Sequence, residues 1–133
     1  MTPPRAAGRV LILSLLLAAV LRVAALGKPL YIDEVTTLTV ASSSLGEMAH
    51  TMRMLDASPA LYPLLLHAWI QVSDADVWAR LLPAIFGWLA VLVVWRVVRD
   101  AVGWKESLAA AFVMAIAPAH VHYAQYVRSY SLF

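Results

Sequence analysis

The chain has no cysteine among its 133 residues, and only 14% of the residues are charged. Without cysteine it can form neither disulfide bonds nor thiolate metal sites, and its redox compartment is left open. The formal net charge of +2 is too small to indicate nucleic-acid binding. Because 62% of the residues are hydrophobic, the polar side chains are too few to cover a globule in water. The composition therefore predicts an integral membrane protein.

Three apolar stretches come close to the roughly 20 residues that a helix needs to cross a bilayer. We place all-α spans at about 10–26, 81–98 and 107–122, and the start of a further span at 129–133. Arg5 and Arg9 precede the first stretch, so a cleaved signal peptide is its alternative, although Arg22 interrupts the region before a good cleavage site. Because the last stretch stops unfinished, we expect residues 1–133 to be the N-terminal part of one larger membrane domain.

A long polar interval, 27–80, separates the first two spans and is predicted to lie outside the hydrocarbon. Its pattern predicts a short helix that begins at Glu34. A second helix is predicted after Ser44, because Glu47 follows at the spacing of a capping box. The apolar stretch 60–72 would extend only about 20 Å as a helix, which is too short to cross. We therefore expect interfacial helices in this first extracytoplasmic loop.

The distribution of positive charge orients the spans. Arg96, Arg99 and Lys105 follow the second span, and basic residues favour the cytoplasmic side of a membrane. This orientation puts the N-terminus in the cytoplasm and the long loop outside. The third span then returns outward and delivers Arg128 to the face on which Asp33 already lies.

Four short motifs follow one another along almost the whole chain. They are YIDE at 31–34, SPALYPLLLHAW at 58–69, ARLLPAIFG at 79–87 and PAHVHYAQYVRSYSL at 118–132. In this order and spacing they resemble motifs of the C-type membrane glycosyltransferases, in particular the bacterial branch related to protein O-mannosyltransferases and to the aminoarabinose transferases of lipid A. The chain departs from that pattern at Ala60, where a second proline is common, at Pro63, which replaces an aromatic residue, and in the residues just before Arg128.

The resemblance implies a multi-pass enzyme of a bacterial inner or plasma membrane. Such an enzyme moves a sugar, with inversion, from a polyprenyl-phosphate donor to a hydroxyl of a lipid, glycan or protein acceptor at the outer face. It makes Asp33 the candidate general base, while the adjacent Glu34 would orient the acceptor or a cation. Arg128 is the candidate for the donor phosphate, because a guanidinium presents a planar fork to phosphate oxygens, and Arg80 would assist it. The remaining substrate-binding candidates are Tyr130, Tyr62 and His67. We expect residues 1–133 alone to be inactive.

Several of these residues have plainer interpretations. Asp33 would serve as the N-cap of the helix predicted to begin at Glu34, a position that aspartate favours. Arg80 would anchor a helix end by extending its guanidinium toward water. His67 would be a hydrogen-bonded histidine at the interface, and Tyr62 would belong to an aromatic belt with the tryptophans.

A metal site and two other functions are also open. Glu34, His120 and His122 offer ligands that suit several divalent ions, but this spacing is not a specific ligand pattern, so no cofactor is certain. Tyr126 or Tyr130 would stack on a sugar ring. A small transporter or channel subunit is one alternative function, because charges near membranes often line pathways. A non-catalytic membrane scaffold is the other.

Overall fold

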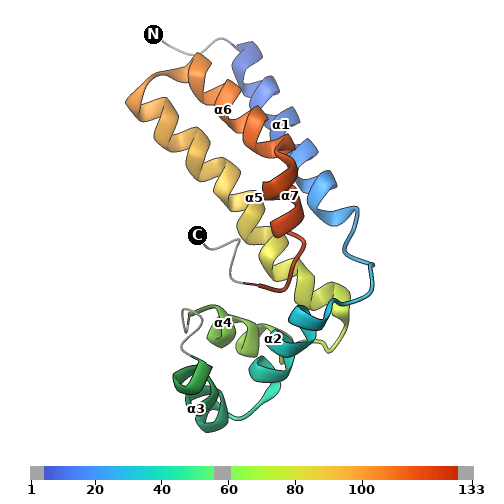
Figure 1. Cartoon of the computed structure of the whole chain (residues 1–133). Helices are drawn as coiled ribbons and strands as arrows, with labels where there is room; N and C mark the ends of the chain where they lie inside the picture. The colour runs from blue at the N-terminus through green and yellow to red at the C-terminus, as the bar shows by residue number, and fades with distance from the viewer. Residues whose placement is uncertain (1–4, 56–60, 129–133) are drawn as a thin grey trace.

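The computed structural model describes residues 5–55 and 61–128, and within these ranges the chain forms helices and no strand. The helices are α1 (Arg5–Val23), α2 (Ile32–Ser42), α3 (Leu45–Leu55), α4 (Leu61–Ile70), α5 (Asp76–Ala101), α6 (Trp104–Ile116) and α7 (Pro118–Tyr123). Figure 1 shows α1, α5 and α6 packed lengthwise as a bundle, with α2, α3 and α4 gathered at one end. The expected all-α fold is confirmed for the described residues. The further span expected to start at 129–133 lies outside them.

Within the described ranges, one helix, α5, is long and apolar enough to cross a membrane, judged by length and composition. The spans predicted at 10–26 and 107–122 do not meet this criterion in the structure. The helix α5 has 26 residues, which extend about 39 Å at 1.5 Å per residue. It begins at Asp76, earlier than the expected span at 81–98, because the polar first turn continues the same helix. The helix α4 has 10 residues, or about 15 Å, and is too short to cross, as expected for 60–72.

The third expected span, 107–122, is not one continuous helix. The helix α6 ends at Ile116, Ala117 has φ −56° and ψ 117°, and α7 begins at Pro118. A residue that precedes proline avoids the α-helical region, and proline has no N–H to continue the helical hydrogen bonds. The expectation of an unbroken helix is therefore wrong at this position.

Small side chains hold the bundle of α1, α5 and α6 together. Ala18, Val91, Ala111 and Ala115 are completely buried where the three helices meet. On α5, Trp88 Nε1 donates a hydrogen bond of 3.0 Å to the Leu15 carbonyl of α1. The outer surface of the bundle is largely apolar, with exposed side chains that include Ile12, Leu13, Leu16, Val20, Leu89, Val93, Val97, Phe112 and Val113. The described residues leave this apolar surface uncovered.

The smaller cluster of helices packs against the first turns of α5. Tyr62 and Leu66 of α4 lie in a core with Leu82 of α5. The rings of Trp69 and Trp78 stack with centroids 4.5 Å apart, and each indole N–H donates to the carbonyl of the other residue at 2.8 and 2.9 Å. This reciprocal pair fixes the end of α4 to the start of α5.

The predicted capping box at the start of α3 is confirmed. Glu47 N–H donates to Ser44 Oγ at 3.3 Å, and Glu47 Oε2 accepts the Ser44 backbone N–H at 3.0 Å. These two bonds satisfy backbone donors that a helix start otherwise leaves without partners.

Candidate functional site

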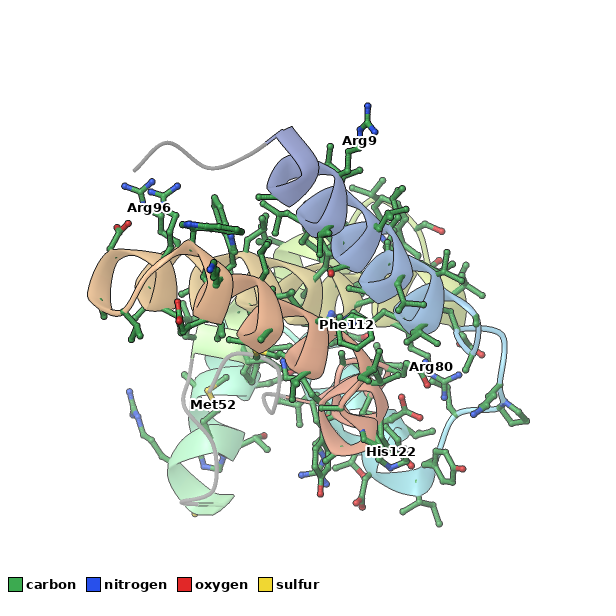
Figure 2. The ribbon with its side chains drawn as sticks, turned by 90° about the horizontal axis from the view of Figure 1, so that it is seen from above. Arg9, Met52, Arg80, Arg96, Phe112 and His122 are labelled. Atoms are coloured by element: carbon green, nitrogen blue, oxygen red, sulfur yellow. The ribbon has the colours of Figure 1, made fainter. Side chains whose placement is uncertain are left out.

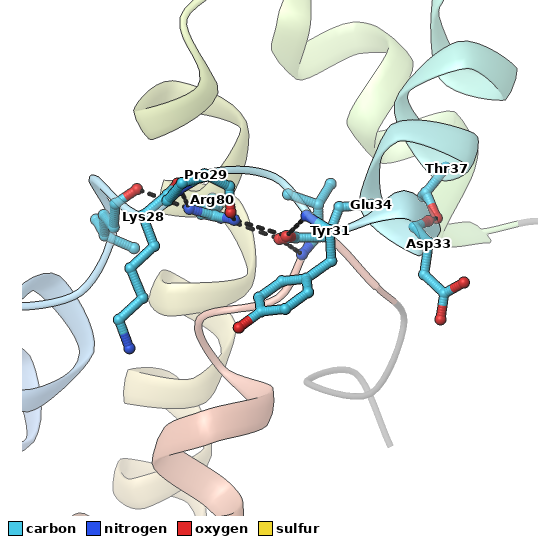
Figure 3. Close-up of polar contacts among 9 residues, drawn as sticks. Lys28, Pro29, Tyr31, Asp33, Glu34, Thr37 and Arg80 are labelled. Carbon is cyan, nitrogen blue, oxygen red and sulfur yellow. Dashed lines mark hydrogen bonds and ion pairs between the residues drawn. The ribbon is translucent and has the colours of Figure 1, made fainter.

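The centre of the candidate site is a buried ion pair between Glu34 of α2 and Arg80 of α5 (Figure 3). Arg80 Nη2 lies 2.6 Å from Glu34 Oε2, and Arg80 Nε lies 3.0 Å from Glu34 Oε1. The two side chains are 2% and 0% exposed. Two parallel N–H···O bonds make this a bidentate pair, the strongest arrangement for these groups.

The Arg80 guanidinium has all five of its N–H groups directed to protein acceptors. Two of them form the ion pair with Glu34. Of the other three, the two on Nη1 donate to the carbonyls of Leu26, at 3.1 Å, and Lys28, and the second one on Nη2 donates to the Pro29 carbonyl at 2.8 Å. Arg80 therefore anchors the loop between α1 and α2. In this arrangement it has no N–H group to offer a donor phosphate, and its guanidinium does not extend to water as the anchoring interpretation expected.

Both carboxylate oxygens of Glu34 also accept hydrogen bonds from within the protein. Its Oε2 accepts the Tyr31 backbone N–H at 2.9 Å, and its Oε1 accepts the Val127 backbone N–H at 3.0 Å. Burial raises the pKa of Glu34, but the hydrogen bonds from Arg80, Tyr31 and Val127 outweigh burial and hold that pKa below its ordinary value. Glu34 is thus an ionised hub that joins three segments, and it does not face the solvent where an acceptor or cation would bind.

Asp33 points away from Glu34 into the solvent (Figure 3). The helix α2 begins at Ile32 and its N-cap is Tyr31, so the interpretation of Asp33 as the cap is wrong. Asp33 Oδ2 lies 3.1 Å from Arg128 Nη2, and the two side chains are 67% and 31% exposed. The structure therefore brings the candidate base and the candidate phosphate ligand together from opposite ends of the chain.

A group of aromatic rings links the start of α2 to the segment that follows α7. Tyr31 and Tyr126 stack with centroids 5.2 Å apart. The His122 ring lies 4.7 Å from Tyr126 and 5.6 Å from Tyr123. Tyr31 and Tyr126 come from the two segments that also carry Asp33 and Arg128, so the stacked rings join those two segments. Stacking of Tyr126 on a sugar stays a prediction.

Three further substrate-binding candidates lie elsewhere. Tyr62 is 1% exposed, burial raises its pKa, and its hydroxyl has no hydrogen-bond partner among the described residues. His67 Nδ1 donates to the Ala41 carbonyl at 2.6 Å and so links α4 to α2, in agreement with its plainer interpretation. Tyr130 lies outside the described residues.

The three metal-ligand candidates are not brought together. Glu34 is held by Arg80, His120 Nδ1 accepts a hydrogen bond of 2.7 Å from Arg22, and His122 lies among the tyrosine rings. Within 5–55 and 61–128, no group of three histidine, aspartate or glutamate side chains is arranged to hold a metal ion. The prediction that Glu34, His120 and His122 share a metal ion is therefore wrong, because each of these side chains contacts a different neighbour.

No protein-family model matches this chain, and neither a curated protein nor a solved structure matches it. The resemblance therefore stays at the level of the short motifs. Any conclusion about function depends on those motifs and on the geometry that the fold gives them.

Arg22 is a site residue that sequence analysis did not assign. Its side chain is 1% exposed, and Nη1 donates to the carbonyls of Ala18 at 2.9 Å and Ala115 at 3.3 Å. Its Nη2 contacts the Met114 carbonyl at 3.5 Å and His120 Nδ1 at 2.7 Å. Arg22 thus caps carbonyls that α6 leaves without partners at its break. The sequence signal for Arg22 was a charge near the end of an apolar stretch, which indicates a buried partner without identifying it.

Gly87 of α5 lets the segment that leads to Arg128 approach closely. A Cβ at position 87 would lie 2.4 Å from Ala124 Cβ and 3.2 Å from Arg22 Nε. We expect Gly87→Ala to lower the free energy of unfolding by about 1–3 kcal/mol, the usual cost of overpacking. Thermal unfolding followed by circular dichroism in detergent measures the effect.

The control for this substitution is Gly46→Ala in α3. A Cβ at position 46 meets no atom within 4 Å, and alanine favours a helix, so the Tm should stay the same or rise. A Gly87→Ala variant with the Tm of the unsubstituted chain would show that the segment does not pack against α5 this closely.

Proposed function

We propose that these residues form part of a multi-pass membrane enzyme that transfers a sugar from a polyprenyl-phosphate donor to an acceptor hydroxyl at the extracytoplasmic face. The observation that carries the proposal is the contact of 3.1 Å between Asp33 and Arg128. The transfer needs a base for the acceptor and a cation for the leaving phosphate in one place. Those two groups meet at the end of the bundle where the loop helices gather.

The surface of the bundle supports a membrane location. A bundle with small residues between its helices and large apolar side chains outside suits lipid better than water. We assign α1, α5 and the α6–α7 pair as the spans. The start of α1, the end of α5 and the start of α6 lie at one end of the bundle (Figure 1), where Arg9, Arg96, Arg99 and Lys105 favour the cytoplasmic side.

The salt bridge between Asp33 and Arg128 is weak enough for the donor phosphate to replace Asp33 as the partner of Arg128. A salt bridge of this exposure contributes about 0–1 kcal/mol, so a phosphate that presents several oxygens displaces Asp33 from Arg128 at little cost. The released carboxylate then accepts the proton of the acceptor hydroxyl. The hydroxyl oxygen bonds to the anomeric carbon as the bond from that carbon to the phosphate oxygen breaks. The departing phosphate keeps the electron pair beside Arg128, and one displacement inverts the anomeric centre.

The buried pair of Glu34 and Arg80 fixes the backbone that carries Asp33 and Arg128. Glu34 bonds the backbone at Val127, the residue that precedes Arg128, and it follows Asp33 directly in α2. One carboxylate thus fixes the backbone on both sides of the site. Such support by neighbouring buried groups is what a reactive pair needs to keep a productive geometry.

The first test is binding of polyprenyl phosphate to the protein in lipid nanodiscs. We expect Arg128→Gln to weaken binding about 10- to 100-fold, because hydrogen bonds to charged groups contribute about 1.5–3 kcal/mol. Arg53→Gln is the matched control, since Arg53 is exposed on α3 at the same end of the molecule and should leave the affinity unchanged.

Equal affinities for the two variants would refute the role of Arg128. A non-catalytic scaffold is not expected to bind polyprenyl phosphate. An absence of binding by the unsubstituted protein would therefore favour the scaffold function. Solute flux into liposomes without dependence on the lipid phosphate would favour a transporter.

A further inference from the structure

A cavity of about 520 Å³ lies at the end of the bundle away from Asp33. Its volume falls within the range of about 300–1,000 Å³ that is usual for ligand pockets. Three helix ends form it, and the lining residues include Gly8 and Leu11 of α1, Trp95 and Arg99 of α5, and Trp104 and Leu108 of α6. The proposed glycosyl transfer does not use this cavity.

Positive charge and tryptophan are combined at the mouth of the cavity. The Arg99 guanidinium lies 4.7 Å from the Trp95 ring centroid, and Lys105 Nζ lies 5.6 Å from that of Trp104. Asp100 pairs with Arg99 at 3.1 Å and also with Arg96 at 3.0 Å. Asp100 is thus shared between two guanidinium groups and does not neutralise Arg99 alone. Glu106, with its carboxylate near Gly103, is the second acidic residue here, so Asp100 and Glu106 stand against Arg9, Arg96, Arg99 and Lys105, and this end of the bundle keeps an excess of positive charge.

Two further basic side chains at this end of the bundle are exposed and lie outside the cavity lining. Figure 2, which views the bundle from this end, shows Arg9 of α1 and Arg96 of α5 projecting away from the helices. The interior wall, by contrast, is made by leucine and tryptophan side chains. A ligand that fits must have an apolar chain and an anionic group at one end of it.

We propose that this cavity binds an anionic glycerophospholipid of the cytoplasmic leaflet. One acyl chain lies between the α1 and α6 walls, and the headgroup phosphate contacts Arg99. Tryptophan and basic residues at a membrane interface suit this depth, where chain and headgroup meet. The inference rests on the proposed membrane location, but it concerns the opposite face from the sugar transfer.

The test measures how many lipid molecules stay bound to the purified protein by native mass spectrometry. Phosphatidylglycerol should be retained in preference to phosphatidylcholine. We expect Arg99→Gln to weaken retention of phosphatidylglycerol about tenfold, the loss of one charge-assisted phosphate contact. Arg96→Gln is the matched control, because it removes the same charge from the same helix at a 62% exposed position outside the cavity lining, and it should change retention less than about twofold.

A second variant fills the cavity without touching the charges. A Cβ at Gly8 meets no atom within 4 Å, so Gly8→Phe places a ring in the cavity without a backbone clash. This variant should lose phosphatidylglycerol and keep its Tm. Gly46→Phe, where a Cβ also meets no atom within 4 Å, should retain the lipid.

Equal retention by Arg99→Gln and Arg96→Gln, or full retention by Gly8→Phe, would overturn the inference. So would equal retention of the two lipids by the unsubstituted protein, even where polyprenyl phosphate still binds through Arg128. Phosphatidylglycerol retention that survives Arg128→Gln and fails in Arg99→Gln supports a separate site, whatever the outcome with polyprenyl phosphate.

Discussion

Replacement of Glu34 by glutamine is expected to lower the free energy of unfolding by about 3–5 kcal/mol, the cost of removing one partner of a buried ion pair. The Arg80 guanidinium stays buried in the variant, but the charge that balances it is lost. The glutamine NH2 group would also face donors at Arg80, Tyr31 or Val127, which need an acceptor. Thermal and denaturant unfolding in detergent measure the loss.

The matched control is Glu47→Gln. Glu47 occupies the same third position of its helix as Glu34 does, but it is exposed, and glutamine also suits a capping box. Its free energy of unfolding should change by about 0.5 kcal/mol or less. Equal stabilities for the two variants would contradict the role of Glu34 as the hub.

The effect of pH gives an independent check on the same carboxylate. Because the folded pKa of Glu34 lies below its ordinary value of about 4.5, its contribution to stability is present above that value. That contribution is lost as the pH falls through the folded pKa. The Glu34→Gln variant should lack this part of the acid dependence, whereas Glu47→Gln should keep it.

Replacement of Asp33 by asparagine is expected to reduce the rate of sugar transfer about 10²- to 10⁴-fold, the usual contribution of a general base. Asparagine has nearly the same shape, so the KM for the donor should change little while Arg128 still binds its phosphate. The assay measures transfer from a radiolabelled polyprenyl-phosphate sugar in membranes of cells that express the native gene.

Asp74→Asn is the control for this substitution, because Asp74 is exposed and lies just before α5, at the same end of the bundle. It should keep the full rate. Since the Asp33–Arg128 pair is exposed, Asp33→Asn should change the stability by no more than about 1 kcal/mol. A normal transfer rate with Asp33→Asn would remove Asp33 from the mechanism.

The features that local sequence determines were predictable. Ser44 and Glu47 are three residues apart, and their capping box needs nothing beyond that spacing. The length of the apolar stretch before Ser73 was enough to predict that α4 is too short to cross a bilayer. The break at Pro118 was also encoded locally, but the apolar run on both sides of it favoured an unbroken span.

The features that depend on the path of the chain were not predictable. The N–H groups of Arg80 donate to the carbonyls of Leu26, Lys28 and Pro29. No local sequence pattern indicates where this loop between α1 and α2 will lie. Arg22 likewise reaches acceptors at the end of α6, which exist only because the helix stops there. Sequence patterns therefore pointed to the charged residues of the site, and the fold divided them into a buried hub and an exposed pair.

The shared extracytoplasmic site of Asp33 and Arg128 is tested most directly by labelling single cysteines from either side of the membrane. Because the chain has no cysteine of its own, each substitution reports one position. In intact cells, a membrane-impermeant maleimide should label Asp33→Cys and Arg128→Cys, and it should label Arg96→Cys only after the membrane is permeabilised. Labelling of positions 33 and 128 from opposite sides would contradict a shared extracytoplasmic site.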